Sequence, residues 1–508
     1  MKVFLQTFGC QMNKLDSAIV ESSLRDAGYQ FVDNAKDADV VLFNTCSVRD
    51  HAEQRVMSHL GHLKHIKESK PDLVVGVIGC MAQRLGSELF KQSAVDIVCG
   101  PAQIAEIPRL IDEAIKEKKK AVAVTEKIRQ LSPDGQALER FETEYGVEDS
   151  EIPGQAYVRA MHGCDKFCSY CVVPYVRGPE TSRPPEAIIE QTRRLAQNGV
   201  KQVTLLGQRI NAYEYKAGDK TYCLADLLNM ISEIDGIEWI KFVTSYPSAK
   251  YFNQIMEAMS KLPKVCRYLH IPAQSGSDNI LKAMNRGYTC AEYLKLLDMA
   301  RQIVPDIAVA GDFIVGFPGE TDNDFAQTVD LIKKARYKNS FIFKYSPRPG
   351  TIADKRLEDN IPQEIKNKRN CELLNVQEEI SGELARDFSG KTVTVLVEGP
   401  SKKSHLDKDI VGRAGLAPPK QSGGVNPTLQ SSAAKSGIQL VGRTATDWIV
   451  VFNGPPASAG ETSPASTCRL GEAGPNGGPS LAGQFATVKI NRTSPLTLFG
   501  ELVENHTA

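Results

Sequence analysis

Short apolar runs alternate with amphipathic helical runs along the first 118 residues. The apolar runs end in polar or glycine-containing turns, and the segments between them repeat apolar residues at helical spacing. Short buried strands separated by helices predict an α/β fold, an open parallel sheet with helices on both faces. The predicted strands cover residues 2–10, 37–46, 71–80 and 94–101, and predicted helices include 17–29 and 107–118.

The same alternation resumes after a polar segment, residues 119–150, which has only weak periodicity and is predicted to be a linker. Six strand–helix units then predict an open, partial (β/α)6 barrel over residues 151–387, with a long helix near 361–387 at its end. The strands of these units are predicted over 156–161, 202–208, 240–247, 267–274, 307–319 and 341–347.

The last part of the chain, residues 388–508, changes to strands alone and predicts a small all-β barrel. Two stretches, near 412–437 and 454–480, are rich in Gly, Pro, Ser and Ala and cannot build a core. We expect flexible insertions there. The five predicted strands cover 390–399, 438–444, 447–454, 483–493 and 496–503.

The charge of the chain is balanced, with 61 Lys and Arg against 61 Asp and Glu over 508 residues. A neutral total gives no overall attraction to nucleic acid, although it does not exclude a local basic face. No apolar run reaches the roughly 18 residues of a membrane span, and the apolar run at the N-terminus is too short for a signal peptide. We therefore expect a soluble, cytoplasmic protein without a membrane partner. In a reducing cytosol, grouped cysteines favour metal binding or catalysis over disulfides.

Three of the twelve cysteines, Cys164, Cys168 and Cys171, stand together after the first predicted barrel strand. That position is a loop at the C-terminal end of the sheet, where barrel active sites lie. Soft thiolates select iron–sulfur clusters or zinc, and zinc would need a fourth nearby ligand, for which only His162 is close. Three thiolates instead suit a cubane cluster with one iron left open.

Three further cysteines, Cys10, Cys46 and Cys80, are 36 and 34 residues apart. Each lies just past the C-terminal end of a predicted parallel strand, the edge where open α/β sheets bind ligands. The spacing recurs because the strands recur, so the three thiols can converge. The alternative is three unrelated buried cysteines. Cys99 also ends a strand, and we expect it to pack in the core rather than to act as a fourth ligand.

The CxxxCxxC motif of the first set resembles that of the radical S-adenosylmethionine (SAM) superfamily. The resemblance implies a [4Fe–4S] cluster whose open iron binds SAM and cleaves it to a deoxyadenosyl radical. It also places Tyr170 beside the adenine of SAM. Other residues at strand ends are candidates for the SAM pocket, although each also suits an ordinary loop: Gln208, Ser245, Gln274, Ser275 and Gly316, with Gly319 nearby.

Three charged residues in "YVRGPETSR" are candidates for binding a charged group of the substrate. They are Arg177, Glu180 and Arg183, and a surface ion network is the alternative.

Further motifs resemble those of the methylthiotransferase family over nearly the whole chain. "TFGCQMNKLDS", "NTCSVRDHAEQRV" and "GVIGCMAQR" are similar to the N-terminal domain of that family, and "LHIPAQSGS", "GFPGET" and "KYSPRPGT" to its radical SAM domain. The resemblance implies that Cys10, Cys46 and Cys80 bind an auxiliary [4Fe–4S] cluster whose open iron presents sulfur to the substrate.

Within the family, "TFGCQMN" and "NTCSVR" are most similar to the branch that methylthiolates carbon 2 of N6-isopentenyladenosine beside the anticodon of tRNA. One departure is Arg209, where the family more often has Asn. Three alternatives stay open: action on a ribosomal protein aspartate, action on threonylcarbamoyladenosine in tRNA, and a non-catalytic iron–sulfur sensor that binds RNA.

The C-terminal strands resemble a TRAM domain, a small barrel that binds RNA. Four basic residues near its strand ends, Lys402, Lys403, Arg413 and Arg443, are candidates for phosphate contacts or are simply solvated. The implied partners are tRNA, a flavodoxin- or ferredoxin-like electron donor and a sulfur donor.

Overall fold

The computed structural model describes residues 1–47, 50–126, 152–401, 438–454 and 481–506, together with residues 128 and 142. The chain divides into two compact units, Met1–Glu151 with Gln155–Ser381, and Ile152–Gly154 with Gly382–Ala508. The N-terminal and central domains expected from the sequence both fall in the first unit, so the boundary between them stays a prediction. Most of the predicted linker, Cys468 and the two predicted insertions (except Gly454) lie outside the described residues.

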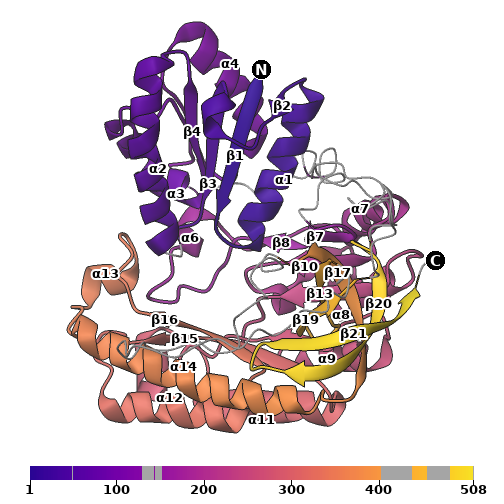
Figure 1. Cartoon of the computed structure of the whole chain (residues 1–508). Helices are drawn as coiled ribbons and strands as arrows, with labels where there is room; N and C mark the ends of the chain where they lie inside the picture. The colour runs from indigo at the N-terminus through magenta and orange to yellow at the C-terminus, as the bar shows by residue number, and fades with distance from the viewer. Residues whose placement is uncertain are drawn as a thin grey trace, which may run out of the picture. The chain divides into compact units, whose positions relative to one another are not determined.

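A parallel sheet in the order β2-β1-β3-β4-β5-β6 forms the N-terminal part of the first unit (Figure 1). The short strands β2 and β6 were not predicted, and β6 lies beyond the predicted boundary at residue 118. Both are too short to show a hydrophobic period. The strands are β1 (Lys2–Phe8), β2 (Gln30–Phe31), β3 (Val40–Thr45), β4 (Val74–Gly79), β5 (Ile97–Cys99) and β6 (Ala121–Ala123).

Helices cover both faces of this sheet, as predicted. Helices α1 (Gln11–Asp26) and α4 (Ile107–Glu117) pack on one face, and α2 (Asp50–Ser69) and α3 (Cys80–Leu85) pack on the other. Strands β3 and β4 are buried at every position, which explains the apolar run of β4 and of the first four residues of β3. Short 3-10 turns, η1 (Ala35–Asp37), η2 (Gly86–Lys91) and η3 (Ile104–Glu106), complete the connections.

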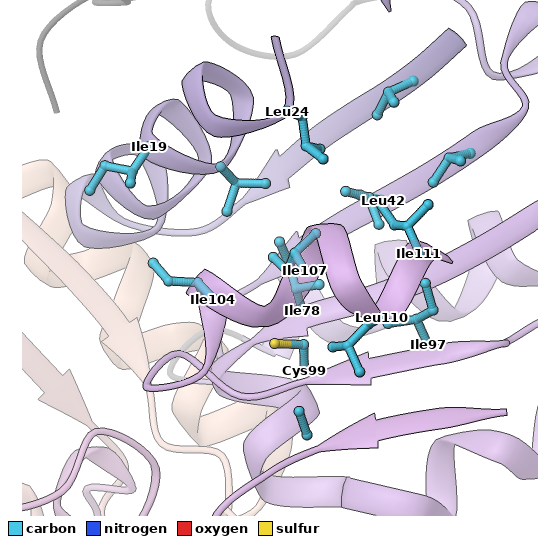
Figure 2. Close-up of a cluster of buried hydrophobic side chains, with 14 of the residues drawn as sticks. Ile19, Leu24, Leu42, Ile78, Ile97, Cys99, Ile104, Ile107, Leu110 and Ile111 are labelled. Carbon is cyan, nitrogen blue, oxygen red and sulfur yellow. The ribbon is translucent and has the colours of Figure 1, made fainter. Parts of the chain in front are cut away.

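Figure 2 shows the apolar core under α1 and α4, where Ile19 and Leu24 of α1 and Ile107 and Leu110 of α4 lie over the sheet. Each fully buried large aliphatic side chain of this kind stabilises the fold by about 1.5–3 kcal/mol. The free thiol of Cys99 lies in the same cluster, with no exposed surface.

Six parallel strands form the central part of the first unit. They make two three-stranded sheets, β13-β10-β7 and β14-β15-β16, which meet through a parallel bridge between Ile240 and Val265. The resulting open arc confirms the predicted partial barrel. Its strands are β7 (Gln155–Arg159), β10 (Gln202–Leu206), β13 (Trp239–Val243), β14 (Tyr268–His270), β15 (Ala308–Val315) and β16 (Asn339–Lys344).

The connections between these strands are mostly helical, as predicted, and the long last helix agrees closely with its expected range. They are α7 (Pro185–Gln197), α8 (Leu224–Ser232), α9 (Phe252–Lys261), α10 (Asp278–Ala283), α11 (Cys290–Ile303), α12 (Asp322–Ala335), α13 (Ile352–Arg356) and α14 (Gln363–Arg386). A hairpin, β11 (Glu214–Ala217) with β12 (Lys220–Cys223), was not predicted and follows the turn η5 (Ile210–Ala212).

The second unit contains a closed five-stranded barrel in the order β17-β18-β19-β21-β20, which confirms the predicted barrel. Closure leaves no free strand edge among its strands. Its core contains Val395, Trp448, Val450 and Leu498. The strands are β17 (Thr392–Pro400), β18 (Gln439–Arg443), β19 (Ile449–Asn453), β20 (Phe485–Thr493) and β21 (Thr497–His506).

Gly316, on the loop after β15, packs closely against α14. The φ of Gly316 is 68°, in the left-handed region, and a Cβ at this position would overlap the buried side chain of Lys366 on α14. The ammonium of Lys366 donates to Asp359 at 2.6 Å. The Gly316 amide donates to Glu320 Oε2 at 2.7 Å, and this oxygen also accepts from Arg369 of α14 at 2.7 Å.

We predict that Gly316→Ala destabilises the protein more than Gly319→Ala. Both positions have positive φ, which costs an alanine about 1–2 kcal/mol, but only Gly316 has a neighbour within contact distance. Overpacking against Lys366 adds about 1–3 kcal/mol. Denaturant midpoints followed by circular dichroism measure the difference. Equal midpoints for the two variants would contradict this packing.

Candidate functional site

The loop that holds Cys164, Cys168 and Cys171 follows β7 and a short strand β8 (Met161–His162), as predicted. It runs directly into the short helix α6 (Val173–Val176) and then β9 (Thr181–Ser182), which pairs with β8. Cys164 and Cys168 are buried and Cys171 is half-buried. The Cys171 amide donates to the Cys168 carbonyl at 3.0 Å, and the Lys166 amide donates to Cys164 Sγ at 3.4 Å.

Distant segments fix the backbone of this loop. The Ser169 amide donates to the Met284 carbonyl at 2.9 Å, and its hydroxyl donates to the Ala283 carbonyl at 2.8 Å. The Ser169 carbonyl accepts from the Ala353 amide at 2.7 Å, and Asn285 Nδ2 donates to the Phe167 carbonyl at 2.7 Å. The thiols are therefore held in place by protein contacts alone.

Arg286, on the loop between α10 and α11, lies against the first cysteine set. Its Nη1 donates to Cys168 Sγ at 3.4 Å, and its guanidinium lies 4.4 Å from the ring centre of Tyr246 and 5.1 Å from that of Tyr288. Burial raises the pKa of Cys171 to about 12, and Cys168 adds to the effect while Arg286 opposes it. Arg286 therefore places a positive charge beside Cys168, where it favours the thiolate form that binds metal.

The second cysteine set converges at one edge of the N-terminal sheet, as its position after successive strands predicted. The register aligns Phe8, Thr45 and Gly79 on neighbouring strands, so the residues that follow them share the edge. The thiol of Cys10 is hydrogen-bonded to that of Cys46, and Cys10 and Cys80 interact electrostatically. These three are therefore not unrelated core cysteines.

Two buried asparagines support this edge. Asn13 Nδ2 donates to Asn44 Oδ1 at 2.9 Å, and Asn44 Nδ2 donates to the Asn13 carbonyl at 2.9 Å. Cys10 Sγ donates to Asn13 Oδ1 at 3.3 Å. The hydrogen bond with Cys46, the charge of Arg177 and nearby backbone N–H groups lower the pKa of Cys10 to about 5, against the effect of burial. The thiolate is the form that binds metal.

Each cysteine set fits a cubane cluster better than a single ion. Among the residues that the structure describes, no three His, Cys, Asp or Glu side chains are placed to hold one metal ion. Zinc requires ligands about 2.0–2.3 Å from a common point. In a cubane, each cysteine binds a different iron, so the three thiols need not meet. Every described cysteine is a free thiol.

The two cysteine sets are joined by packing. Cys80 forms a buried cluster with Val172, the residue after Cys171, and with Val176, at the end of α6. A cavity of about 350 Å³ opens beside this contact, between α3 and α6. Its walls include Arg84 from α3, Tyr175 from α6, and Val124, Thr125 and Pro349. The cavity therefore shares Val172 and Val176 with the contact that joins the two cysteine sets.

Arg177, a candidate for substrate binding, instead contacts the second cysteine set. Its Nε donates to Cys80 Sγ at 3.3 Å, and its Nη2 donates to Asp16 Oδ2 at 2.8 Å. The other oxygen of Asp16 accepts from Arg159 Nη2 at 2.5 Å. The ion network anticipated as an alternative for Arg177 is therefore present, but it is buried rather than on the surface.

Arg183 and Glu180 also have protein partners. Arg183 is buried, and its Nη1 donates to the Arg159 carbonyl at 2.7 Å and to Gln191 Oε1 at 2.8 Å. Glu180 pairs with Arg209 at 3.4 Å, and burial raises the pKa of this carboxyl while Arg209 lowers it. Arg209 thus finds a partner where the family more often has Asn.

Gln208 and Ser245 have the features expected of ligand-binding residues. They lie two residues past Leu206 and Val243, which are paired on neighbouring strands. Gln208 Oε1 and Ser245 Oγ are buried and have no hydrogen-bond partner among the described residues. Buried oxygens without a partner are costly, so a polar ligand such as the amino group of SAM fits this edge.

The other candidates for the SAM pocket, Tyr170, Gln274, Ser275 and Gly316, have different surroundings in the structure. Tyr170 packs in a cluster with Met284 and Phe317 beside the first cysteine set. Gln274 has a φ of 71°, a backbone conformation that is often found at functional sites. Ser275 instead bonds Thr328 at 3.2 Å and, like Gly316, has a packing role. SAM contacts of these residues stay a prediction.

Cys99 and His162 do not join either cysteine set. Cys99 Sγ donates to the Gln103 carbonyl at 3.2 Å, and burial raises its pKa, in agreement with the predicted packing role (Figure 2). Burial, together with Arg159 and Arg177, lowers the pKa of His162 to about 4.

In the second unit, the candidate Arg443 forms ion pairs with Glu398 at 2.9 Å and with Asp447 at 3.1 Å. Lys402, Lys403 and Arg413 lie outside the described residues, so RNA binding by the barrel stays a prediction.

Three functional contacts had no signal in the sequence. Arg286 is 118 residues from Cys168, and Arg177 is 97 residues from Cys80 and 161 from Asp16. Separations of this size follow no periodicity, so only the folded chain brings these groups together.

No helix in the described part of the chain is long and apolar enough to cross a membrane.

Two family models match parts of the chain. The radical SAM superfamily matches residues 158–332, and the uncharacterized protein family UPF0004 matches residues 2–100. The solved structure of a radical S-adenosylmethionine methyltransferase, TsrM, from Kitasatospora setae is 15% identical with a TM-score of 0.48, covering 67% of this chain and 72% of that one.

Full-length relatives are much more similar. The tRNA-2-methylthio-N(6)-dimethylallyladenosine synthase of Rhodopirellula baltica is 43% identical over 90% of this chain and 91% of that protein. The protein of the same name from Burkholderia mallei is 38% identical over 99% of this chain and 98% of that protein. The chain therefore belongs to the radical SAM methylthiotransferase family, with the tRNA-2-methylthio-N(6)-dimethylallyladenosine synthases as relatives.

Proposed function

We propose that this protein methylthiolates tRNA at carbon 2 of N6-isopentenyladenosine beside the anticodon, giving 2-methylthio-N6-isopentenyladenosine. The observation that carries the proposal is the packing of Cys80 against Val172 and Val176, which puts two incomplete thiol sets next to each other. The names of relatives that match nearly the whole chain support the choice of substrate.

In this proposal, Cys164, Cys168 and Cys171 hold the SAM-binding [4Fe–4S] cluster, and Cys10, Cys46 and Cys80 hold the auxiliary one. When bound, these clusters and SAM supply the radical that removes hydrogen from the base and the methylthio group that replaces it. The protein orients and shields them. Ser169 fixes the first loop, the Arg286 side chain covers Cys168, and the free oxygens of Gln208 and Ser245 receive polar groups of SAM.

The target adenine would enter the cavity between α3 and α6. Part of the cavity lining is apolar and suits an isopentenyl group, namely Val124, Val172, Val176 and Pro349, and the rest includes the polar Gln83, Arg84, Thr125 and Glu126. Tyr175 at the cavity is exposed, and its ring meets that of Phe167 edge-on, with centres 6.0 Å apart. Enzymes that act on a base take it out of the stack, and exposed aromatic rings support such bases.

The reaction requires electrons and sulfur that the protein does not itself contain. We infer a flavodoxin- or ferredoxin-like electron donor and a separate sulfur donor. A tRNA substrate and free thiols in the described residues fit the cytoplasm. Pull-down with candidate donors, followed by reduction of the bound clusters, tests the partner assignment.

The full-length protein, reconstituted anaerobically with iron and sulfide, should methylthiolate tRNA that carries isopentenyladenosine. The assay adds SAM, a reductant and tRNA lacking the methylthio group, and nucleoside mass spectrometry detects the product. The Cys168→Ala variant is the control and should give no product, because it removes one of three thiols from the first set.

The same assay separates the alternatives. A panel with threonylcarbamoyladenosine tRNA and the ribosomal protein reveals a different substrate if the isopentenylated tRNA stays unmodified. A non-catalytic iron–sulfur sensor would release no deoxyadenosine from SAM after reduction. Either outcome would overturn the proposed function.

Iron analysis should count two clusters in the full-length protein and one after removal of either thiol set. The expected iron content is about eight per chain, falling to about four in Cys10→Ala/Cys46→Ala/Cys80→Ala. Cys99→Ala is the matched control and should keep the full count, because this thiol lies in the apolar core. An unchanged count in the triple variant would remove the auxiliary cluster from the proposal.

Tyr175→Ala should raise the KM for tRNA, while Tyr175→Phe should not. Stacking of one base on an aromatic ring contributes about 1–3 kcal/mol, which corresponds to about a 5- to 150-fold change in affinity. Phenylalanine keeps the ring and is therefore the matched control. An unchanged KM in the alanine variant, at normal iron content, would place the base elsewhere.

A further inference from the structure

The guanidinium of Arg177 uses only part of its bonding capacity. Nε donates to Cys80 Sγ and Nη2 donates to Asp16, as described for the site. Nη1 is also buried, yet it has no hydrogen-bond partner among the described residues. The side chain as a whole is only 4% exposed, so bulk water does not supply the missing acceptor.

An unpaired buried N–H group costs about 1–3 kcal/mol, and more when the group is charged. Asp16 does not relieve this cost, because its oxygens accept from Arg159 and from Nη2 of Arg177, and neither forms a hydrogen bond with Nη1. The same guanidinium also contacts sulfur, since its Nε lies 3.3 Å from Cys80 Sγ. The free donor therefore lies on the same rigid guanidinium that contacts a thiol of the second cysteine set.

We propose that Arg177 is a positioning residue of the auxiliary site. Nε donates to the ligand thiolate of Cys80, and Nη1 donates to the anionic sulfur that becomes the methylthio group. This inference rests on the proposed function and names the residue that orients the transferred sulfur. Charge-assisted hydrogen bonds of this kind are shorter and stronger than neutral ones, so they fix direction as well as charge.

Asp16 and Arg159 fix the direction of this donor. The planar guanidinium presents its N–H groups in a rigid fork, so the bond from Nη2 to Asp16 also sets where Nη1 points. Lysine carries the same charge on a flexible stem with no fork. Arg177→Lys therefore keeps the charge and loses the direction, whereas Arg177→Gln loses both.

The first test measures the reduction of the auxiliary cluster. It uses the full-length chain with Cys164, Cys168 and Cys171 replaced by Ala, so that only the auxiliary cluster is observed by electron paramagnetic resonance. Hydrogen bonds and positive charge near a cluster favour its reduced form. Arg177→Gln should lower the ratio of reduced to oxidised cluster about tenfold at fixed potential, which equals 59 mV for one electron. Arg286→Gln is the matched control and should cause no shift, because its contact is with Cys168.

The second test titrates the same proteins with methanethiolate, a probe for the transferred sulfur. Both Arg177→Lys and Arg177→Gln should bind it about tenfold more weakly than the parent, and Arg286→Gln should bind it normally. Unchanged reduction and unchanged affinity in an iron-loaded Arg177→Gln protein would overturn the proposal. If that variant does not load iron, Arg177→Lys decides through its methanethiolate affinity. A parent protein that loads no auxiliary cluster would refute the proposed function itself, which separates the two failures.

Discussion

The buried carboxylate of Asp16 holds together the two halves of the first unit. It lies on α1 of the N-terminal sheet and accepts hydrogen bonds from Arg159, which ends a barrel strand, and from Arg177, which follows α6. Removing one partner of a buried ion pair generally costs about 3–5 kcal/mol, because the other charge is left uncompensated. The helix that begins after Cys10 is thereby fixed to the segment that follows Cys171.

This constraint gives the two cysteine sets their relative position. The register of the parallel strands brings Cys10, Cys46 and Cys80 to one edge of the N-terminal sheet, and this does not depend on the central barrel. The Asp16 ion pairs and the packing of Cys80 on Val172 and Val176 then place that edge against the barrel loop. A reaction that uses a radical from one site and sulfur from another needs both sites close to the same base. The shared interface supplies this proximity within one compact unit.

Both sets also have the same chemical arrangement. Each contains three thiols, and in each one thiol accepts a hydrogen bond from an arginine far away in the chain, Arg286 for Cys168 and Arg177 for Cys80. Burial opposes thiolate formation, and a buried positive charge offsets part of that cost. The arginines differ in one respect that bears on function. Arg286 stacks on Tyr246 and Tyr288, whereas Arg177 keeps a buried N–H free.

The sequence by itself determined the order of elements, the parallel sheet, the open barrel, the closed small barrel and both cysteine sets. Those features depend on local periodicity and on how far one strand–helix unit extends along the chain. It did not reveal β6, which follows a run of three lysines, or the β11–β12 hairpin, whose strands are mostly half-buried or exposed and carry few apolar residues. Only the tertiary structure decided the roles of the charged residues. Arg177 contacts the second cysteine set, and Arg183 and Glu180 have protein partners. The physical reason is that the role of a charged side chain depends on its buried partners in the folded chain, and for Arg177 these partners are 97 and 161 residues away.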